Sequence, residues 1–281
     1  MTSSPTLTFN DGNTIPQLGY GVWQVEDDVA EKVVFQAFQA GFRHIDTAKI
    51  YGNESGVGRA IASSGLSAEE IFITTKLWNS DQGYESTLAA FEESLERLGL
   101  ETLDLYLIHW LQPKQDKYVD TWKALIELQK RGRVKSIGVS NFTIEGLQRI
   151  IDETGVVPAI NQVELHPYFS QPELREFNAS QGILTQAWSP LGQGGELLED
   201  PIIAGIAQKH DATPAQVVIA WHLAIGNVVI PKSVTESRIR ENFDALNVTL
   251  DAEDVEAING LDRTAEGTGR IGPDPAVSDF A

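Results

Sequence analysis

Short β-branched, apolar runs alternate with longer amphipathic stretches along most of the chain. Runs of this kind predict buried strands, whereas apolar residues spaced three or four apart predict helices. The spacing from run to run suits a repeat of one strand and one helix. The predicted strands are Leu18–Val22, Arg43–Asp46, Ile71–Lys76, Leu103–His109, Val134–Val139, Ala159–Val163, Ile183–Ala187 and Val228–Ile230.

The stretches between these runs have the features of helices. Apolar side chains recur at helical spacing in Leu88–Leu98, and Gly99 follows as a helix-ending glycine. Thr213–Gln216 combines a threonine, a proline at the first helical position and a glutamine, which predicts a capped helix start. Ser170–Glu173 has the spacing of a second capping box. We therefore expect helices to follow the strands.

The two ends of the chain differ from this repeat. Thr6–Phe9 and Thr14–Pro16 flank Asp11–Asn13, whose turn residues predict an N-terminal β-hairpin. The last stretch, Gly260–Ala281, is rich in Gly, Pro and Asp and has no periodicity. Such a segment is either packed on the surface or partly disordered. We favour a C-terminal tail that packs over a barrel mouth.

The order of the elements leaves two fold classes open, because strict β-α alternation is compatible with a closed barrel or an open doubly wound sheet. An open sheet that binds a dinucleotide should carry the pattern G-x-G-x-x-G after its first strand. Gly19 and Gly21 are followed by Val22–Val25, without a third glycine. Eight strands favour an α/β fold of the (β/α)8 TIM-barrel type, with residues 1–281 as a single domain.

The composition excludes several classes of protein. The chain has no cysteine, which rules out disulfides, thiolate metal sites and cysteine nucleophiles. Its formal net charge of −19 disfavours binding to nucleic acid and to anionic membranes. The start, Met1–Pro5, lacks a signal-peptide pattern, and no apolar run is long enough to cross a membrane. We expect a cytoplasmic protein in which any anionic cofactor meets locally concentrated cations.

Four polar residues lie at or after neighbouring predicted strand ends: Asp46, Tyr51, Lys76 and His109. In a barrel the catalytic groups come from these ends. The Lys76 ammonium, if it lies beside the phenol, should lower the pKa of Tyr51. Asp46 can pair with Lys76, and His109 can hydrogen-bond a substrate carbonyl oxygen. Such a set provides the general acid and oxyanion site that carbonyl reduction by hydride needs. Spacing alone leaves a purely structural role for these residues open.

Three long motifs resemble those of the aldo-keto reductase family and occur in the same order. They are Gly41–Ala48 continuing through Tyr51–Glu54 and Val57–Gly58, then Ile137–Phe142, then Ile230–Thr235 continuing through Arg238 to Glu241 and Asn242. The resemblance implies that Tyr51 donates the proton, that Lys76 modifies its pKa with support from Asp46, and that His109 orients the carbonyl group. Leu77–Asn79, His109–Trp110 and Trp188–Gly192 look most like bacterial members of the 2,5-diketo-D-gluconate reductase type.

The same resemblance implies NADPH as the cofactor, in preference to NADH, and assigns residues to each of its parts. Ser140, Asn141 and Gln162 match positions that bind the nicotinamide carboxamide, Trp188 a stacking platform, and Ser189, Leu191, Gly192 and Gln193 a loop near the pyrophosphate. Lys232, Ser233 and Arg238 match the site of the 2′-phosphate and adenine, within a motif that also contains Val234, Glu241 and Asn242. The alternative is that Lys232 and Arg238 are solvated surface cations.

Aromatic residues near the predicted strand ends suggest a substrate pocket. Trp23, Trp78 and Trp110 lie just past those ends, and with His109 they match family positions that line the carbonyl site. Trp122 and Trp221 are predicted to be core residues. The implied substrates are small aldehydes, dicarbonyls or keto-sugar acids. None of the predicted pocket residues is a cation that could bind a substrate carboxylate.

Two other functions remain as alternatives. A chain of this fold could be a non-catalytic NADP(H)-binding sensor or interaction protein, although the four polar residues disfavour that role. It could instead be a metal-dependent barrel hydrolase or isomerase, but the five histidines show no metal-ligand spacing. We therefore expect no metal, no nucleic-acid partner and no membrane partner, and we expect a monomer.

Overall fold

The chain forms a closed barrel of parallel strands in the computed structural model, which describes residues 3–278 and 280. Eight strands pair side by side in chain order from β3 to β10, and a parallel bridge between Leu18 and Val229 closes the barrel. The strands are β3 (Tyr20–Gly21), β4 (His44–Asp46), β5 (Phe72–Leu77), β6 (Leu103–Ile108), β7 (Val134–Ser140), β8 (Ile160–Glu164), β9 (Leu184–Trp188) and β10 (Val228–Val229). The predicted (β/α)8 fold is confirmed.

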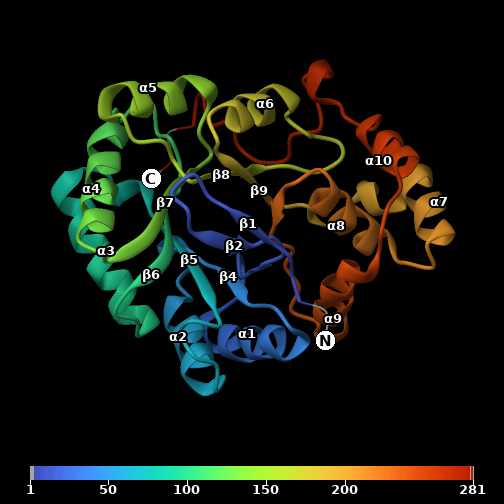
Figure 1. Cartoon of the computed structure of the whole chain (residues 1–281), viewed down its shortest axis with the longest axis horizontal. Coiled ribbons are helices and arrows are strands. Elements are labelled where there is room, and N and C mark those ends of the chain that lie inside the picture. Colours follow the sequence, from blue (N-terminus) through green and yellow to red (C-terminus); the bar gives the residue numbers. More distant parts are fainter. Residues whose placement is uncertain (1–2, 279, 281) are drawn as a thin grey trace.

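Helices surround the strands on the outside of the barrel (Figure 1). They are α1 (Asp27–Ala40), α2 (Glu54–Ser63), α3 (Tyr84–Leu98), α4 (Tyr118–Lys130), α5 (Ile144–Thr154), α6 (Pro172–Ser180), α7 (Pro201–Lys209), α8 (Pro214–Ala224), α9 (Glu236–Asp244) and α10 (Ala252–Asn259). Several short 3-10 turns connect these elements, among them η1 (Lys49–Tyr51).

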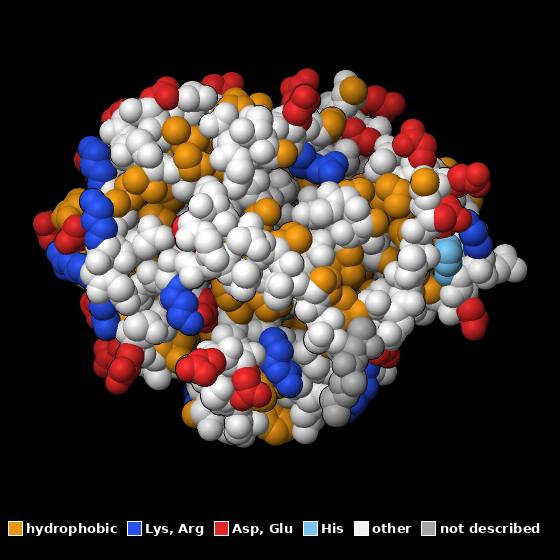
Figure 2. Space-filling model, in the orientation of Figure 1, with side chains coloured by type: hydrophobic (Ala, Val, Ile, Leu, Met, Phe, Trp, Pro, Cys, Tyr) orange, Lys and Arg blue, Asp and Glu red, His pale blue; other side chains and the backbone are white. Residues whose placement is uncertain are grey.

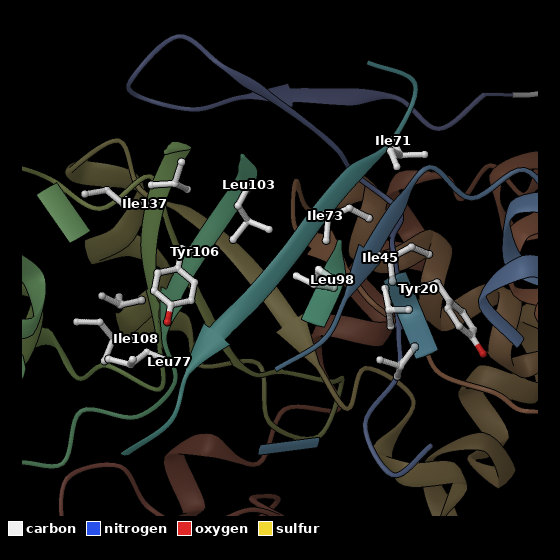
Figure 3. Packing of buried hydrophobic residues seen from close by; sticks show 14 of the residues in the cluster. Tyr20, Ile45, Ile71, Ile73, Leu77, Leu98, Leu103, Tyr106, Ile108 and Ile137 are labelled. Atoms are coloured by element: carbon white, nitrogen blue, oxygen red, sulfur yellow. The ribbon is translucent and has the colours of Figure 1, made fainter. Parts of the chain in front are cut away.

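The core lies between the strands and the surrounding helices, and Figure 3 shows part of it. Every residue of β5 and β6 is buried, as expected for parallel strands covered on both faces. The apolar face of α3 packs on this layer: the ring of Phe91 lies 4.9 Å from that of Tyr106 in β6. The helix then ends at Gly99, whose φ of 67° favours glycine. Trp122 and Trp221 are fully buried, which confirms their predicted place in the core.

The N-terminal hairpin covers one end of the barrel. Strands β1 (Thr6–Thr8) and β2 (Thr14–Pro16) are antiparallel, as predicted, and cross in front of the barrel in Figure 1. Phe9 and Ile15 are buried against barrel residues. Figure 2 shows this face: acidic side chains gather mainly toward its perimeter, where the helices lie. This end is therefore closed by side chains, and any ligand must enter from the other end.

The C-terminal tail crosses that other end. It leaves α10 and runs behind the strands in Figure 1, and Gly272, Pro273 and Phe280 border the cleft there. These three residues confirm the predicted packing over the barrel mouth, whereas Asp279 and Ala281 of the same predicted tail lie outside the described residues. Met1 and Thr2, part of the stretch judged not to be a signal peptide, lie outside them as well.

Most strands begin or end one residue away from their predicted bounds, and two differences are larger. The first barrel strand is shorter than Leu18–Val22, because only Tyr20–Gly21 keep regular pairing with β4. The capping box at Ser170 is wrong: α6 has Gln171 at its N-cap, in a left-handed conformation, and the Ser170 amide donates to Asp262 instead. The capping box at Thr213 is confirmed, with both hydrogen bonds present. No helix in the described part of the chain is long and apolar enough to cross a membrane.

Candidate active site

The four predicted polar residues meet at the open end of the barrel. Asp46 ends β4, Tyr51 lies in η1 just beyond it, Lys76 is next to last in β5, and His109 directly follows β6. Strand pairing places β4, β5 and β6 next to one another, so side chains distant in sequence converge. The rings of Tyr51 and His109 lie edge to face with centroids 5.7 Å apart.

Lys76 and Asp46 form an ion pair that is shielded from solvent. The Lys76 Nζ atom lies 2.5 Å from Asp46 Oδ1, and the side chains are 0% and 2% exposed. Lys76 also donates to the carbonyl oxygen of Thr47 at 2.8 Å, and Gln162 Nε2 donates to Asp46 Oδ2 at 2.7 Å. Both carboxylate oxygens therefore have a donor. Because either charge alone would be very costly to bury, the pair is held together strongly.

The electrostatics around Tyr51 differ from the prediction. Burial, with a smaller contribution from the Asp46 carboxylate, raises the pKa of the Tyr51 phenol well above 10. The Lys76 Nζ atom lies 5.1 Å from the centre of the Tyr51 ring and is directed at Asp46 and Thr47. The prediction that Lys76 lowers the pKa of Tyr51 is therefore wrong for the cofactor-free protein, since desolvation outweighs the neighbouring charge. The phenol stays protonated at neutral pH.

His109 is a neutral imidazole in this environment. Burial, and then the nearby Lys76 charge, lower its pKa well below 6.5. Its Nδ1 atom is buried and has no hydrogen-bond partner among the described residues. Its ring packs edge to face against Trp78, with centroids 5.2 Å apart. A neutral imidazole held by its neighbours can donate a hydrogen bond from its N–H to a carbonyl oxygen without carrying a charge.

A cleft of about 1170 Å³ extends from these residues along the barrel mouth. Its inner end is aromatic and includes the predicted Trp23, Trp78 and Trp110. Trp23 is 44% exposed, as a residue at a rim should be, whereas Trp110 is buried. Phe280 in the tail completes this end, with its ring centroid 4.9 Å from that of Trp110. Phe280 was not among the predicted site residues, because nothing local distinguishes an aromatic residue in a segment without periodicity.

The middle of the cleft holds the residues predicted to lie near a nicotinamide. Ser140, Asn141, Gln162 and Trp188 all border it. Asn141 adopts a left-handed conformation, with φ of 56°, directly after β7, which asparagine tolerates better than most residues. Its Nδ2 atom donates to the carbonyl of His109, and its Oδ1 atom accepts from Trp188 Nε1 at 2.9 Å. Trp188 is thus linked to the backbone of His109 through Asn141.

The outer end of the cleft carries the predicted cations. Lys232, Ser233, Val234, Arg238, Glu241 and Asn242 border it, as do Ser189, Leu191 and Gln193 from the loop after β9. Lys232 and Arg238 are exposed, and neither forms an ion pair with any carboxylate of residues 3–278 and 280. Arg238 lies in the first turn of α9, whose N-cap residue Thr235 makes no capping bond. Cations and free helix amides at one place favour a phosphate group.

One predicted cofactor residue does not border the cleft. Gly192 lies in the loop after β9, where Gly192, Gln193 and Gly194 are all left-handed. A Cβ atom at Gly192 would lie 3.3 Å from Leu197, so the residue determines the path of the loop. In the same region Thr213 and Pro214 border the cleft but were not predicted as site residues.

The sequence and the barrel match those of known proteins. The sequence profile of the Aldo/keto reductase family matches residues 16–263. The chain belongs to the aldo/keto reductase family. An aldo-keto reductase of Mycolicibacterium smegmatis is 56% identical over 99% of both chains, and a methylglyoxal reductase DkgA of Escherichia coli is 49% identical over 98% of both. This confirms the family resemblance and the predicted NADP-dependent oxidoreductase class.

Solved structures agree with the fold. A point mutant of Gox0644 in complex with NADPH superimposes with a TM-score of 0.94, at 52% identity, over 99% of this chain and all of that one. An aldo-keto reductase of Bombyx mori in complex with NADP has a TM-score of 0.87 at 34% identity, over 94% of each chain. No group of three or more His, Asp or Glu suited to hold a metal occurs in the part of the chain that the structure describes.

Proposed function

We propose that the protein reduces small carbonyl compounds with NADPH, and that Tyr51 is the general acid. NADPH supplies the hydride. A single cleft is bordered by aromatic side chains, by the cations Lys232 and Arg238, and by three of the four polar residues, Asp46, Tyr51 and His109. That arrangement is the observation on which the proposal rests.

Each of the four residues has a distinct part in the proposal. Tyr51 is half-buried and protonated, so its hydroxyl can donate a proton to the oxygen of a carbonyl that accepts hydride. Neutral His109 holds the carbonyl oxygen in line with that proton. The Lys76 ammonium, 5.1 Å from the centre of the phenol ring, offsets part of the negative charge that Tyr51 acquires as the proton leaves, and Asp46 holds that ammonium in place.

The cofactor residues follow the same division of the cleft. We propose that Trp188 stacks on the nicotinamide, that Ser140, Asn141 and Gln162 bind its carboxamide, and that Lys232, Ser233 and Arg238 bind the 2′-phosphate and adenine. The side-chain amide of Gln162 donates its two hydrogens to Asp46 Oδ2 and Gln186 Oε1. Gln162 therefore presents its carbonyl oxygen to the carboxamide and links the cofactor to Asp46.

The aromatic end favours a small neutral substrate. Among the residues that border the cleft, the cations are Lys232 and Arg238, and both lie at the outer end. A keto-sugar acid would bring a carboxylate to the inner end without a cationic partner, whereas methylglyoxal carries no charge. Relatives named methylglyoxal reductase point the same way.

The proposal is tested by following NADPH absorbance with methylglyoxal and 2,5-diketo-D-gluconate. Tyr51→Phe should lower kcat by about 10²–10⁴-fold, because it removes the general acid. NADPH affinity should stay within about twofold, since the ring is retained. Tyr84→Phe, which alters an exposed tyrosine, is the matched control. An unchanged rate in Tyr51→Phe would rule out the acid role, and NADPH binding without turnover across a carbonyl panel would favour the sensor alternative.

A further inference from the structure

A second buried carboxylate, Glu164, lies at the mouth of the barrel outside the four polar residues. It is the last residue of β8 and only 2% exposed. Its Oε1 atom accepts the backbone N–H of Ile271 at 2.6 Å, and its Oε2 atom accepts that of Gly272 at 2.7 Å. His166 Nε2 lies 3.2 Å from Oε1. Glu164 thus joins the barrel to the C-terminal tail.

These contacts account for a carboxylate in a buried position. No Lys or Arg in residues 3–278 and 280 forms an ion pair with Glu164. Hydrogen bonds from backbone amides to a charged oxygen are short and about twice as strong as bonds between neutral groups. The tail amides therefore compensate much of the desolvation of this carboxylate. If the tail left, Glu164 would lose the donors that hold it.

The same piece of tail lies against the proposed nicotinamide platform. Glu164 and Trp188 are partners in the register of β8 and β9. A Cβ atom on Gly272 would lie 2.5 Å from Cη2 of Trp188 and 2.9 Å from Oε2 of Glu164. Only a glycine backbone can thus lie between the indole and the carboxylate. Trp188 is held by Asn141 at its Nε1 atom and by Gly272 at its six-membered ring.

We propose that Glu164 is a positioning residue for hydride transfer, because it clamps the Ile271–Gly272 backbone and thereby fixes the Trp188 indole at the angle that nicotinamide stacking requires. This inference rests on the proposed function. It adds a role for a residue that does not touch the reacting atoms. It also gives Ile271–Gly272, in the middle of the tail, a role distinct from that of Phe280, which borders the substrate end.

The inference is tested by comparing two ligands in Glu164→Gln. The amide keeps the size of the side chain but turns an NH2 group toward one of the two tail amides, which then loses its acceptor. The Kd of NADP+ should rise about tenfold, as expected for lost bonds to a charged group, and kcat should fall. Binding of 2′-phospho-ADP-ribose, which lacks nicotinamide, should stay within about twofold. Equal weakening of both ligands, or of neither, would overturn the inference.

A variant of the tail removes the same contact from the other side, and a second variant at the same position is its control. Ile271→Pro eliminates the N–H that Glu164 accepts, whereas Ile271→Ala shortens an exposed side chain and keeps that N–H. The proline variant should reproduce the selective loss of NADP+ affinity, and the alanine variant should resemble the unchanged protein. Thermal unfolding of all variants identifies any that fails to fold. Identical behaviour of the proline and alanine variants would contradict the clamp.

Amide hydrogen exchange in the cofactor-free protein separates this inference from the proposed function. The Ile271 and Gly272 amides should exchange slowly in the unchanged protein and at least about tenfold faster in Glu164→Gln, because opening of the clamp exposes them. Fast exchange in both proteins would overturn the clamp whatever the cofactor does. Failure of the unchanged protein to bind NADP+ would instead overturn the proposed function.

Discussion

The two ends of the cleft handle charge in opposite ways. At the inner end, Lys76 and Asp46 are buried and paired with each other, and their charges cancel. At the outer end, Lys232 and Arg238 are exposed and have no carboxylate partner within residues 3–278 and 280. Because the two charges cancel at a distance, the inner pair acts mainly on groups a few ångströms away, where the low dielectric constant strengthens the interaction. The outer cations attract an anion from solution, against a protein of net charge −19.

This difference teaches that burial, rather than residue type, determines what a cation does here. In the proposed function, the buried Lys76 at the inner end acts on the neighbouring phenol, whereas the exposed Lys232 at the outer end binds an incoming phosphate. The two ends should therefore respond differently to mutation and to pH.

The largest effect is expected from Lys76→Met, which leaves the Asp46 carboxylate buried without its partner. Breaking such a pair should lower the free energy of unfolding by about 3–5 kcal/mol, and turnover should be lost as well. The measurement is urea unfolding together with NADPH oxidation. Lys123→Met removes a lysine from an exposed pair with Asp120 and should cost no more than about 1 kcal/mol. Similar losses in both variants would show that burial does not distinguish the two pairs.

An intermediate effect is expected from Lys232→Met at the outer end. Loss of one cation at a phosphate should raise the Kd of NADPH about tenfold, leave that of NADH nearly unchanged, and barely alter the free energy of unfolding. Titration calorimetry with both cofactors measures this. Arg240→Ala, nearby in α9 but paired with Glu236, is the control and should leave both affinities unchanged. Equal loss of NADPH and NADH affinity in Lys232→Met would show that this lysine does not bind the 2′-phosphate.

The smallest effect concerns pH. The pKa of His109 lies well below 6.5 and that of Tyr51 well above 10. At saturating NADPH, kcat should therefore stay nearly constant from about pH 5.5 to 9, as both groups keep their protonation state. The Kd of NADPH should rise as the pH falls through about 6, where a phosphate monoester gains a proton. A step in kcat near 6.5 that disappears in His109→Gln would contradict a buried neutral imidazole.

Protein stability follows the same shift with a definite sign. An unfolded His109 titrates near 6.5, whereas the folded one stays neutral until well below that pH. Below about 6.5 the unfolded state therefore binds more protons, and this group makes the folded state less stable as the pH falls further. Unfolding measured in parallel defines the range over which the kcat profile is valid.

Much of the fold was predictable because its signals are local. The strand runs and the helix that ends at Gly99 are recorded in the spacing of a few neighbouring residues, and the predicted elements formed. Cap and boundary predictions were less secure. Ser170 and Thr213 carry comparable patterns, but the Ser170 amide found a long-range partner in Asp262 whereas the Thr213 box formed. Tertiary contacts decided between them.

By itself, the sequence determined the barrel, the four polar residues at its strand ends and the cation motif at Lys232, because each belongs to a periodic pattern or a contiguous motif. Only the tertiary structure decided how deeply these groups are buried. Burial reversed the expected pKa shift of Tyr51, since desolvation depends on every atom packed around the phenol. The tertiary structure also brought Phe280 to the substrate end and Gly272 to Glu164, contacts that span more than a hundred residues and leave no local pattern.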